Sequence, residues 1–375
     1  MLVQVRSTVL PALLAIGFAA TAQAPASLKD AYQGDFVIGA AINAAQITGE
    51  DVRGDAIIKA QFNSISPENC LKWESVHPQP DEYDFTIPDQ YVAFGEKSHM
   101  FIVGHNLVWH NQVPAWVFRD DKGNLLDRDA LLARMRDHIH TMVGRYKGRI
   151  QSWDVVNEAL NEDGTMRQSL WEKIIGDDYI AKAFQYAHEA DPQAQLTYND
   201  YNLENEAKRS GAIALITKLK GEGVPITSVG LQGHDSLTWP TVDQMDATIS
   251  AFAKLGMKVA ISELDVDVLP PATRQATADV TVSIQQNAAL NPYVNGLPDS
   301  VQQQLAKRYA DLFGVFLKHR DVVNRVTFWG VTDGDSWRND WPARGRTSYP
   351  LLFDRAGQPK PAFDAVIRAA GQPAS

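Results

Sequence analysis

The 375-residue sequence has a single cysteine, Cys70, so it cannot form an intramolecular disulfide bond. Beyond its first segment it has no run of 18 apolar residues, so we expect no membrane-spanning helix. It has no Pro/Thr/Ser-rich linker and no low-complexity run that would indicate an additional binding domain. Basic residues are outnumbered, since 35 Lys and Arg against 45 Asp and Glu leave a net charge of −10. We therefore expect no nucleic-acid partner, because an acidic surface repels phosphate groups.

Common signatures of cofactor binding, serine nucleophiles and metal binding are also missing. No G-x-G-x-x-G follows an apolar run, as it does in dinucleotide-binding sheets, and no G-x-S-x-G marks a nucleophilic serine. There is no H-E-x-x-H and no Cys/His cluster, and His138 and His140, two apart on a predicted helix, point to different sides. We therefore predict no cofactor and no metal centre. A calcium ion held by loop carbonyls would leave no such signature.

The first 24 residues have the pattern of a removable export signal. Arg6 precedes twelve apolar residues, Val9–Ala20, and Ala22-Gln23-Ala24 then has the small-x-small form of a signal peptidase site. A short membrane anchor is the alternative, but twelve residues cannot cross a bilayer core, which needs about 20. We predict a signal peptide over residues 1–24 and an exported mature chain, either periplasmic or secreted.

Residues 25–375 alternate between short apolar runs and helical patterns. In the helical pattern over 129–147, Leu131, Met135, Ile139 and Met142 recur at helical spacing. Eight strands alternating with helices predict a single-domain α/β protein, a (β/α)8 TIM barrel, with an open doubly wound sheet as the alternative. The other helices are expected at 178–190, 206–222, 242–255 and 300–319. The strands are expected at 36–41, 62–66, 101–104, 150–156, 195–198, 228–231, 258–262 and 325–328.

Polar and aromatic side chains follow the predicted strands, at the end where a barrel places its chemistry. Glu158 comes directly after the fourth strand and Glu263 after the seventh, on opposite sides of the barrel mouth. Two carboxyls across a cleft can hydrolyse a glycosidic bond, because one protonates the leaving oxygen while the other attacks or activates water. A pair of structural carboxylates in ion pairs is the alternative interpretation.

The neighbours of the two glutamates fit these catalytic roles. Asn157 can hydrogen-bond a sugar hydroxyl beside the reacting centre. His234 and Asp265 can form a pair that orients Glu263 and holds it ionised, as a nucleophile requires, whereas the acid needs a raised pKa. An isolated core histidine is the alternative for His234.

Taken together, these residues give the sequence a resemblance to the glycoside hydrolase family 10 endo-β-1,4-xylanases over residues 28–370. The resemblance implies a (β/α)8 barrel and a retaining double displacement on xylan or xylo-oligosaccharides. It implies Glu158 as the acid/base and Glu263 as the nucleophile, with carboxyls about 5–5.5 Å apart. The segments that carry it are Gly104-His105-Asn106-Leu107-Val108-Trp109-His110, Trp153-Asp154-Val155-Val156-Asn157-Glu158, Ile261-Ser262-Glu263-Leu264-Asp265 and Trp329-Gly330-Val331-Thr332-Asp333.

The same resemblance implies how a xylan chain is bound. Glu68, Asn69 and Lys72 would hold hydroxyls of the sugars on the non-reducing side. Trp329 and Trp337 would enclose the reacting sugar and crowd the space of a glucose hydroxymethyl group. Tyr201 would contribute to the leaving-group side, and Trp73 is expected close to the cleft. The substrate-binding residues implied in this way are Glu68, Asn69, Lys72, His105, Trp109, Gln232, Trp329 and Trp337.

Three other functions are weighed against this one. A barrel hydrolase for cellulose or mannan would use the same chemistry. A non-catalytic sugar-binding barrel would keep the tryptophans but lose a carboxylate, and both glutamates are present. An enzyme acting on a phosphorylated metabolite would need a Gly-rich phosphate loop after strands seven and eight, which is absent. We expect a monomer whose partner is the xylan or xylo-oligosaccharide substrate.

Overall fold

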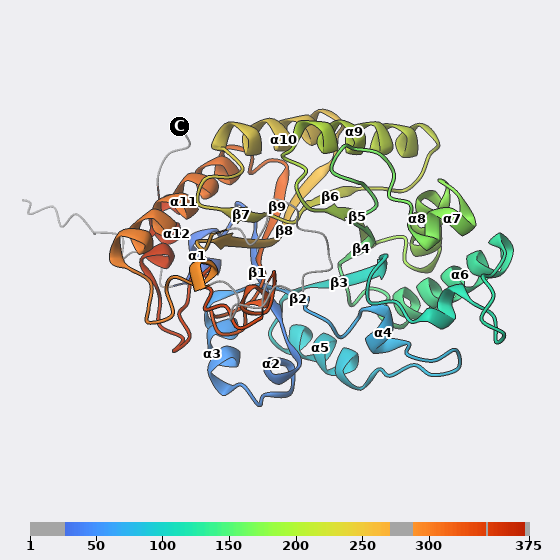
Figure 1. Ribbon diagram of the computed structural model, residues 1–375, viewed down its shortest axis with the longest axis horizontal. Coiled ribbons are helices and arrows are strands. Elements are labelled where there is room, and N and C mark those ends of the chain that lie inside the picture. Colours follow the sequence, from blue (N-terminus) through green and yellow to red (C-terminus); the bar gives the residue numbers. More distant parts are fainter. Residues whose placement is uncertain (1–26, 271–287, 343, 372–375) are drawn as a thin grey trace, which may run out of the picture.

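Eight parallel strands lie side by side in the computed structural model, which describes residues 27–270, 288–342 and 344–371 (Figure 1). The predicted signal peptide and residues 271–287 of the expected loop before the last strand lie outside the described residues. The barrel strands are β1 (Val37–Ile42), β2 (Ser64–Pro67), β3 (Phe101–Val108), β4 (Ser152–Asn157), β5 (Gln195–Asp200), β6 (Ser228–Leu231), β8 (Lys258–Asp267) and β9 (Val323–Phe328).

The sheet closes on itself because each of these strands has two parallel neighbours. β1 pairs with β2 and with β9, and β6 pairs with β5 and with β8, so the order around the barrel is β1-β2-β3-β4-β5-β6-β8-β9. A further short strand, β7 (His234–Ser236), lies beside the end of β8. The closed order confirms the predicted (β/α)8 barrel and excludes the open doubly wound sheet.

Helices surround the strands and connect each to the next (Figure 1). The α-helices are α1 (Leu28–Ala31), α2 (Ala44–Thr48), α3 (Val52–Gln61), α4 (Trp73–Val76), α5 (Thr86–Lys97), α6 (Arg128–Arg145), α7 (Leu170–Ile175), α8 (Tyr179–Ala190), α9 (Glu206–Gly221), α10 (Val242–Lys254), α11 (Asp299–Lys318) and α12 (Pro361–Ala370). Short 3₁₀ turns are η1 (Ala115–Phe118), η3 (Ala288–Leu290) and η4 (Trp337–Asn339).

The long helices begin at polar caps and bury one apolar face. In α6 the side chain of Asp127 accepts a hydrogen bond from the backbone N–H of Ala130, which satisfies one of the free donors at the helix start. Leu131, Met135 and Ile139 then recur at helical spacing and are buried against the barrel. Helix α10 begins at a reciprocal capping box.

Close packing inside the barrel wall depends on a glycine in β3. A Cβ atom placed on Gly104 would lie 2.1 Å from the ring of Trp153 on β4, a distance that real contacts do not reach. Gly104 and Trp153 are register partners, and the Trp153 ring is fully buried. Glycine is therefore the residue that lets these two neighbouring strands approach with a tryptophan between them.

The pairing register is irregular in three of the strands. Shifts occur between His105 and Val108 in β3, between Asp154 and Val156 in β4, and between residues 261 and 264 in β8. Such irregularities re-aim side chains that a regular strand would direct elsewhere. All three lie in strands that carry, or lead into, predicted site residues.

The first and last described segments meet on one side of the barrel. β1 is paired with β9, and α1 contacts α12 through a 2.6 Å hydrogen bond from the Tyr32 hydroxyl to the carbonyl of Val366. Tyr32 also stacks on Phe36, with ring centroids 5.0 Å apart. The two ends of the fold are therefore covered by a common apolar cluster.

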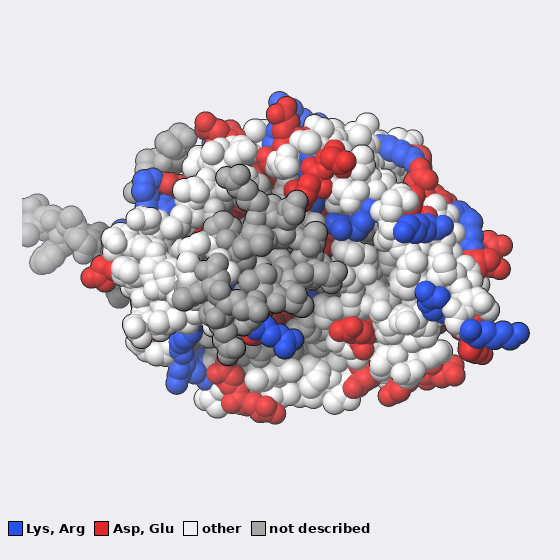
Figure 2. Space-filling model, viewed as in Figure 1, with Lys and Arg blue, Asp and Glu red and all other residues white. Residues whose placement is uncertain are grey.

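The surface carries charges of both signs. On the face in Figure 2, Lys and Arg side chains are interspersed with Asp and Glu around the visible rim, with no continuous patch of one sign. Across 27–270, 288–342 and 344–371, no helix combines the length and the apolar character that crossing a bilayer would require.

Candidate active site

Glu158 follows β4 in a backbone conformation that is unusual for a residue with a side chain. Its φ of +58° lies in the left-handed region, which the Cβ atom disfavours. The backbone N–H of Glu158 donates to the carbonyl of Asn199 on β5 at 2.9 Å. The carbonyl of Glu158 accepts a 2.9 Å hydrogen bond from Nε of Arg167. Both sides of the strained residue are thus fixed by neighbouring segments.

The Glu158 carboxyl is bound by three side-chain donors. Oε2 accepts from Nε1 of Trp109 at 2.9 Å, and Oε1 accepts from Nε2 of Gln232 at 3.2 Å and from Nδ2 of Asn157 at 3.3 Å. Burial raises the pKa of Glu158, the negative charges of Asp200 and Glu263 raise it further, and the hydrogen bonds from Trp109 and Gln232 oppose the shift. A raised pKa keeps a carboxyl protonated, so Glu158 can act as an acid.

Glu263 lies within β8 and has the opposite electrostatic environment. Oε1 of its buried carboxylate accepts from Nδ2 of Asn199 at 2.7 Å, and Oε2 lies 3.2 Å from Nε2 of His234. Burial alone would raise the pKa of Glu263, but His234, the charge of His105 and the Asn199 bond together hold that pKa below its ordinary value. Glu263 can therefore stay ionised, as a nucleophile must.

The structure brings His234 and Asp265 together beside Glu263. Nδ1 of His234 lies 3.2 Å from Oδ1 of the fully buried Asp265. Asp265 also accepts from Nε1 of Trp337 at 2.7 Å and from Nε of Arg338 at 2.8 Å. Burial lowers the pKa of His234, but the two carboxylates outweigh it and raise that pKa to about 9. His234 is therefore a cation between two carboxylates.

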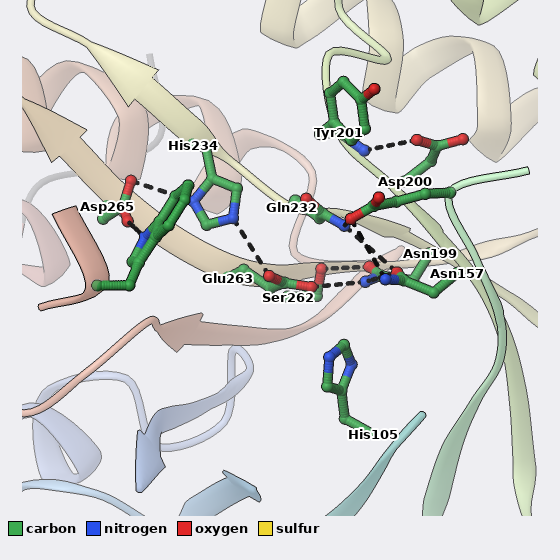
Figure 3. Close-up of polar contacts among 12 residues, drawn as sticks. His105, Asn157, Asn199, Asp200, Tyr201, Gln232, His234, Ser262, Glu263 and Asp265 are labelled. Atoms are coloured by element: carbon green, nitrogen blue, oxygen red, sulfur yellow. Dashed lines mark hydrogen bonds and ion pairs between the residues drawn. The ribbon is translucent and has the colours of Figure 1, made fainter. Parts of the chain in front are cut away.

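Three side-chain amides connect the two glutamates. Figure 3 shows these amides, Asn157, Asn199 and Gln232, beside Glu263. Nδ2 of Asn199 contacts both Glu263 and, at 2.8 Å, the amide of Asn157. Nε2 of Gln232 lies 3.3 Å from the Asn157 amide and also contacts Glu158. Because amides carry no net charge, this chain fixes the positions of both carboxyls without adding a charge to either.

Lys72 brings a positive charge to the rim of the site. Its Nζ donates to Oδ1 of Asn69 at 3.0 Å and to Oε1 of Gln112 at 2.8 Å, and lies 5.1 Å from the centre of the Trp109 ring. Burial lowers the pKa of Lys72, an effect that the nearby glutamates oppose. Burial raises the pKa of Glu68, and the positive charge of Lys72 opposes this rise. Glu68, Asn69 and Lys72 thus form one polar cluster.

Aromatic residues complete the surroundings of the two carboxyls. His105 is buried, with Nδ1 2.9 Å from Oδ2 of Asp154, and its ring meets that of Trp329 edge-on at 5.2 Å. Trp337 stacks on Trp341 with ring centroids 4.8 Å apart. The rings are therefore held in fixed orientations by their own neighbours, which favours their packing against the apolar C–H face of a sugar ring.

Tyr201 lies beyond Glu158, after β5. Its hydroxyl accepts from Nη2 of Arg167 at 2.9 Å, and Nζ of Lys208 lies 3.4 Å from the centre of its ring. Lys208 is fully buried and paired with the equally buried Asp200 at 2.9 Å. Arg167 and Lys208 thus hold Tyr201 in a defined position at the end of β5.

Several residues of the site were not predicted from the sequence. Asn199 binds Glu263, Gln112 binds Lys72, Arg338 binds Asp265 and Arg167 binds Glu158. Asn199 had a usable signal, because it continues directly from the predicted fifth strand. The other three lie on loops or on η4, where no periodic pattern indicates which way a side chain points.

Trp73, expected close to the cleft, directly follows Lys72 of the site and is itself a packing residue. It is buried and stacks on His138 with ring centroids 3.7 Å apart, and it contacts Trp171 at 5.4 Å. The Nδ1 atoms of His138 and His77 lie 3.3 Å apart. Within the described residues, no group of three or more His, Cys, Asp or Glu side chains is placed to hold a metal ion. The two histidines therefore belong to an aromatic cluster.

The barrel and its two carboxyls define a class of protein. One glutamate has a raised pKa and the other a lowered one, and both meet the same chain of amides at the carboxyl ends of the strands. An acid paired with an ionised carboxylate, flanked by aromatic rings, is the arrangement of a glycoside hydrolase.

Comparison with known proteins narrows this class to one family. Residues 27–369 match the model of glycosyl hydrolase family 10, and the chain belongs to that family. The endo-1,4-β-xylanase A of Xylanibacter ruminicola is 42% identical over 356 residues, which cover 95% of this chain and 96% of that protein. A GH10 endoxylanase from a sugarcane soil metagenome superposes with a TM-score of 0.87 at 47% identity, covering 92% of this chain and 100% of that one. A mutant protein solved in complex with xylotriose has a TM-score of 0.81 at 37% identity, with coverages of 91% and 99%.

Proposed function

We propose that this chain is a retaining endo-1,4-β-xylanase in which Glu263 is the nucleophile and Glu158 the acid/base. The observation that carries the proposal is the opposite pKa directions of two glutamates joined by one chain of amides. The relatives support the substrate, because those at 42% identity and 47% identity are an endo-1,4-β-xylanase and an endoxylanase. The related protein solved with xylotriose supports the same class of ligand.

The reaction has two steps. In the first, Oε of Glu263 attacks the anomeric carbon, the glycosidic C–O bond breaks, and the proton of Glu158 passes to the leaving oxygen. In the second, Glu158 takes a proton from water, the water oxygen bonds to the anomeric carbon, and the Glu263 ester bond breaks. The sugar leaves with its original configuration because the carbon is inverted twice.

The charge of Glu263 helps to switch Glu158 between its two tasks. In the free enzyme that charge raises the pKa of Glu158, which favours the protonated acid. Once Glu263 is esterified, its carboxylate charge is gone and this contribution disappears. The pKa of Glu158 then falls, which favours the ionised base required in the second step.

The sugar-binding residues divide between the two sides of the cleavage point. Glu68, Asn69 and Lys72 offer acceptors and donors for hydroxyls on the non-reducing side, and Tyr201 serves the leaving group. Trp337 crowds the position of a hydroxymethyl group, which favours xylose over glucose. The remaining substrate contacts come from His105, Trp109, Gln232 and Trp329. Asn157, His234 and Asp265 support the catalytic pair.

Product analysis tests the reaction and the substrate together. Purified enzyme is incubated separately with xylan, cellulose, mannan and xylotetraose, and the products are separated by chromatography. A ladder of xylo-oligosaccharides from xylan, with no release from cellulose or mannan, is the expected result. Release only from cellulose or mannan, or only single xylose units from chain ends, would overturn the proposal.

We also propose that the chain is exported and acts as a monomer. Export rests on residues 1–24, whose charged, apolar and small-residue regions have the order of a signal peptide. Expression of the full sequence in a bacterial host, followed by N-terminal sequencing of the protein outside the cytoplasm, tests this, with a start at Pro25 expected. Light scattering of the purified protein tests the monomer against its chain mass.

A further inference from the structure

The loop that follows β4 holds Glu158 in a conformation that its own backbone disfavours. A residue with a Cβ atom at a φ of +58° persists only when the surrounding structure holds it there. The main chain turns back on itself directly afterwards, since the N–H of Arg167 donates to the carbonyl of Ala159 at 2.8 Å. Leu160 and Met166 form an isolated antiparallel bridge within the same loop. The segment from Glu158 to Arg167 is therefore one compact unit.

The guanidinium of Arg167 makes three hydrogen bonds, two within this unit and one to Tyr201. Nε donates to the carbonyl of Glu158 at 2.9 Å, and Nη2 donates to the carbonyl of Leu160 at 3.2 Å and to the hydroxyl of Tyr201 at 2.9 Å. A planar guanidinium presents its donors in a fixed fork, so these contacts fix the relative orientation of the two carbonyls. The Tyr201 contact also ties the loop to the end of β5.

The opposite side of the loop rests on a buried ion pair. Oδ2 of Asp200 accepts from the N–H of Leu160 at 3.4 Å, and Oδ1 accepts from the N–H of Tyr201 at 2.9 Å. Nζ of Lys208 lies 2.9 Å from Asp200, and both side chains are fully buried. Replacing either Asp200 or Lys208 would leave the charge of the other buried without its partner, which destabilises the whole fold. Arg167, which is half-buried and binds neutral acceptors, is the more informative residue to change.

Building on the proposed function of Glu158, we propose that Arg167 is a positioning residue for this acid/base. By binding the carbonyls of Glu158 and Leu160, Arg167 holds the left-handed backbone that presents the Glu158 carboxyl to Trp109 and Gln232. Without it, Glu158 relaxes toward an ordinary conformation and its proton no longer points at the leaving oxygen. Arg167 touches no reacting atom, so its effect on protonation of the leaving oxygen reaches the reaction through Glu158, whereas its bond to Tyr201 bears on how both aryl substrates are bound.

Leaving-group dependence tests this role. The values of kcat/KM are measured for Arg167→Ala with phenyl β-xylobioside and with 2,4-dinitrophenyl β-xylobioside. The dinitrophenolate of the second substrate leaves with little need of protonation by an acid. We expect a loss of about 100-fold on the phenyl substrate and of less than about threefold on the activated one, within the range that proton transfer supplies. Arg167→Lys, which can bind one of the carbonyls, should recover part of the phenyl activity. Equal losses on both substrates, or no loss, would overturn the inference.

A double variant and a matched control separate positioning from folding. In a Glu158→Ala background, adding Arg167→Ala should change the ratio of the two rates by less than about twofold, because the residue through which it acts on the acid step is gone. Arg134→Ala is the control: Arg134 also binds backbone carbonyls, those of Trp116 and Arg119, but none of the proposed site. It should show no leaving-group dependence. A changed ratio of the two rates in the double variant, or the same dependence in Arg134→Ala, would contradict the role of Arg167.

Failure of this inference is distinguishable from failure of the proposed function. If Glu158→Ala itself loses equally on the two aryl xylobiosides, Glu158 is not the acid and the proposed function falls first. If Glu158→Ala shows the dependence and Arg167→Ala does not, only the positioning role is wrong. All rates are divided by the concentration of sites trapped by a 2-fluoro-xylobioside inactivator, so that unfolded protein does not count.

Discussion

Nε2 of His234 lies 3.2 Å from Oε2 of Glu263, which places a cationic ring against the carboxylate that we propose as the nucleophile. The other ring nitrogen faces the carboxylate of Asp265, which also stabilises the positive charge of the ring. The pKa of His234 is raised to about 9, and that of Glu263 is lowered below its ordinary value. The pair therefore keeps opposite charges across the pH range in which the enzyme would work.

The pH dependence of activity should be bell-shaped. Glu263 must be ionised, and its pKa lies below the ordinary glutamate value of 4.5, so the acidic limb lies below 4.5. Glu158 must be protonated, and its pKa lies above that value, so activity falls on the alkaline side as Glu158 ionises. Measurement of kcat/KM on xylotetraose across pH checks both limbs. A flat profile between about pH 4 and about pH 8 would contradict the pair.

Asp265→Asn should lower the pKa of His234 and leave the acidic limb in place. The substitution removes the largest charge that supports the His234 cation, so the pKa of His234, about 9 in the intact site, should fall. The pKa of Glu263 lies below 4.5, where His234 is protonated with or without Asp265, so the acidic limb should not rise. NMR titration of the His234 ring and the pH profile of kcat/KM are the measurements. Asp246→Asn is the control, because Asp246 forms a similar 2.7 Å pair with His319 between α10 and α11. An unchanged pKa of His234 in Asp265→Asn would separate Asp265 from the charge of His234.

Glu263→Ala should abolish hydrolysis of every glycoside while the protein remains folded. Glu263 is the carboxylate that we propose to form the covalent intermediate, so we expect a loss of about four orders of magnitude or more. Activity is measured on xylan and on 2,4-dinitrophenyl β-xylobioside, and folding by thermal melting. Glu96→Ala, which removes a surface glutamate paired with Arg149, should leave both activities unchanged. Substantial turnover by Glu263→Ala would remove it as the nucleophile.

Glu158→Ala should discriminate between leaving groups. Xylan needs a proton on its leaving oxygen, and we expect a loss of about 100-fold to 10,000-fold in kcat/KM. A dinitrophenyl leaving group needs little protonation, so its bond cleavage should be largely spared. Comparison of the two substrates under identical conditions is the measurement, and the acid role is wrong if both decline by the same factor.

Gly104→Ala should destabilise the barrel without touching the carboxyls. The added methyl would meet the Trp153 ring at 2.1 Å, and we expect a loss of about 1–3 kcal/mol in the free energy of unfolding. Gly144→Ala is the matched control, because this glycine lies within α6 and a Cβ there meets nothing within 4 Å. The control should gain up to about 1 kcal/mol. Urea denaturation of both variants checks the difference, and equal stabilities would contradict the packing argument.

Strand positions in this barrel were predictable because buried parallel strands read as continuous apolar runs. All eight predicted runs overlap the barrel strands, and the five predicted helices overlap α6, α8, α9, α10 and α11. β7 was not predicted, because its three residues are all polar and pair only with β8. Nor was α3, where only Gly54 and Ile58 are buried, so its sequence carries almost no amphipathic pattern.

The candidate site was predictable where a residue follows a strand and less so elsewhere. Glu158 and Glu263 could be picked out because the end of a barrel strand fixes the place of the residues there. The strand ends were expected too early, however: β8 runs to Asp267, so Glu263 and Asp265 lie inside it. The bonds from Arg167 and Arg338 could not be predicted, because each depends on loops that bring residues from distant parts of the sequence together.

The contact between α1 and α12 has a consequence for how the chain can be cut and rejoined. Because β1 is paired with β9 and Tyr32 is bonded to Val366, the two ends of the described fold are spatial neighbours. A circular permutant that joins Ser27 to Gly371 by a flexible linker and opens at the exposed turn around Gly223 would keep every strand pair. Such an enzyme would present new termini beside α9, where a binding module could be fused without extending the natural ends.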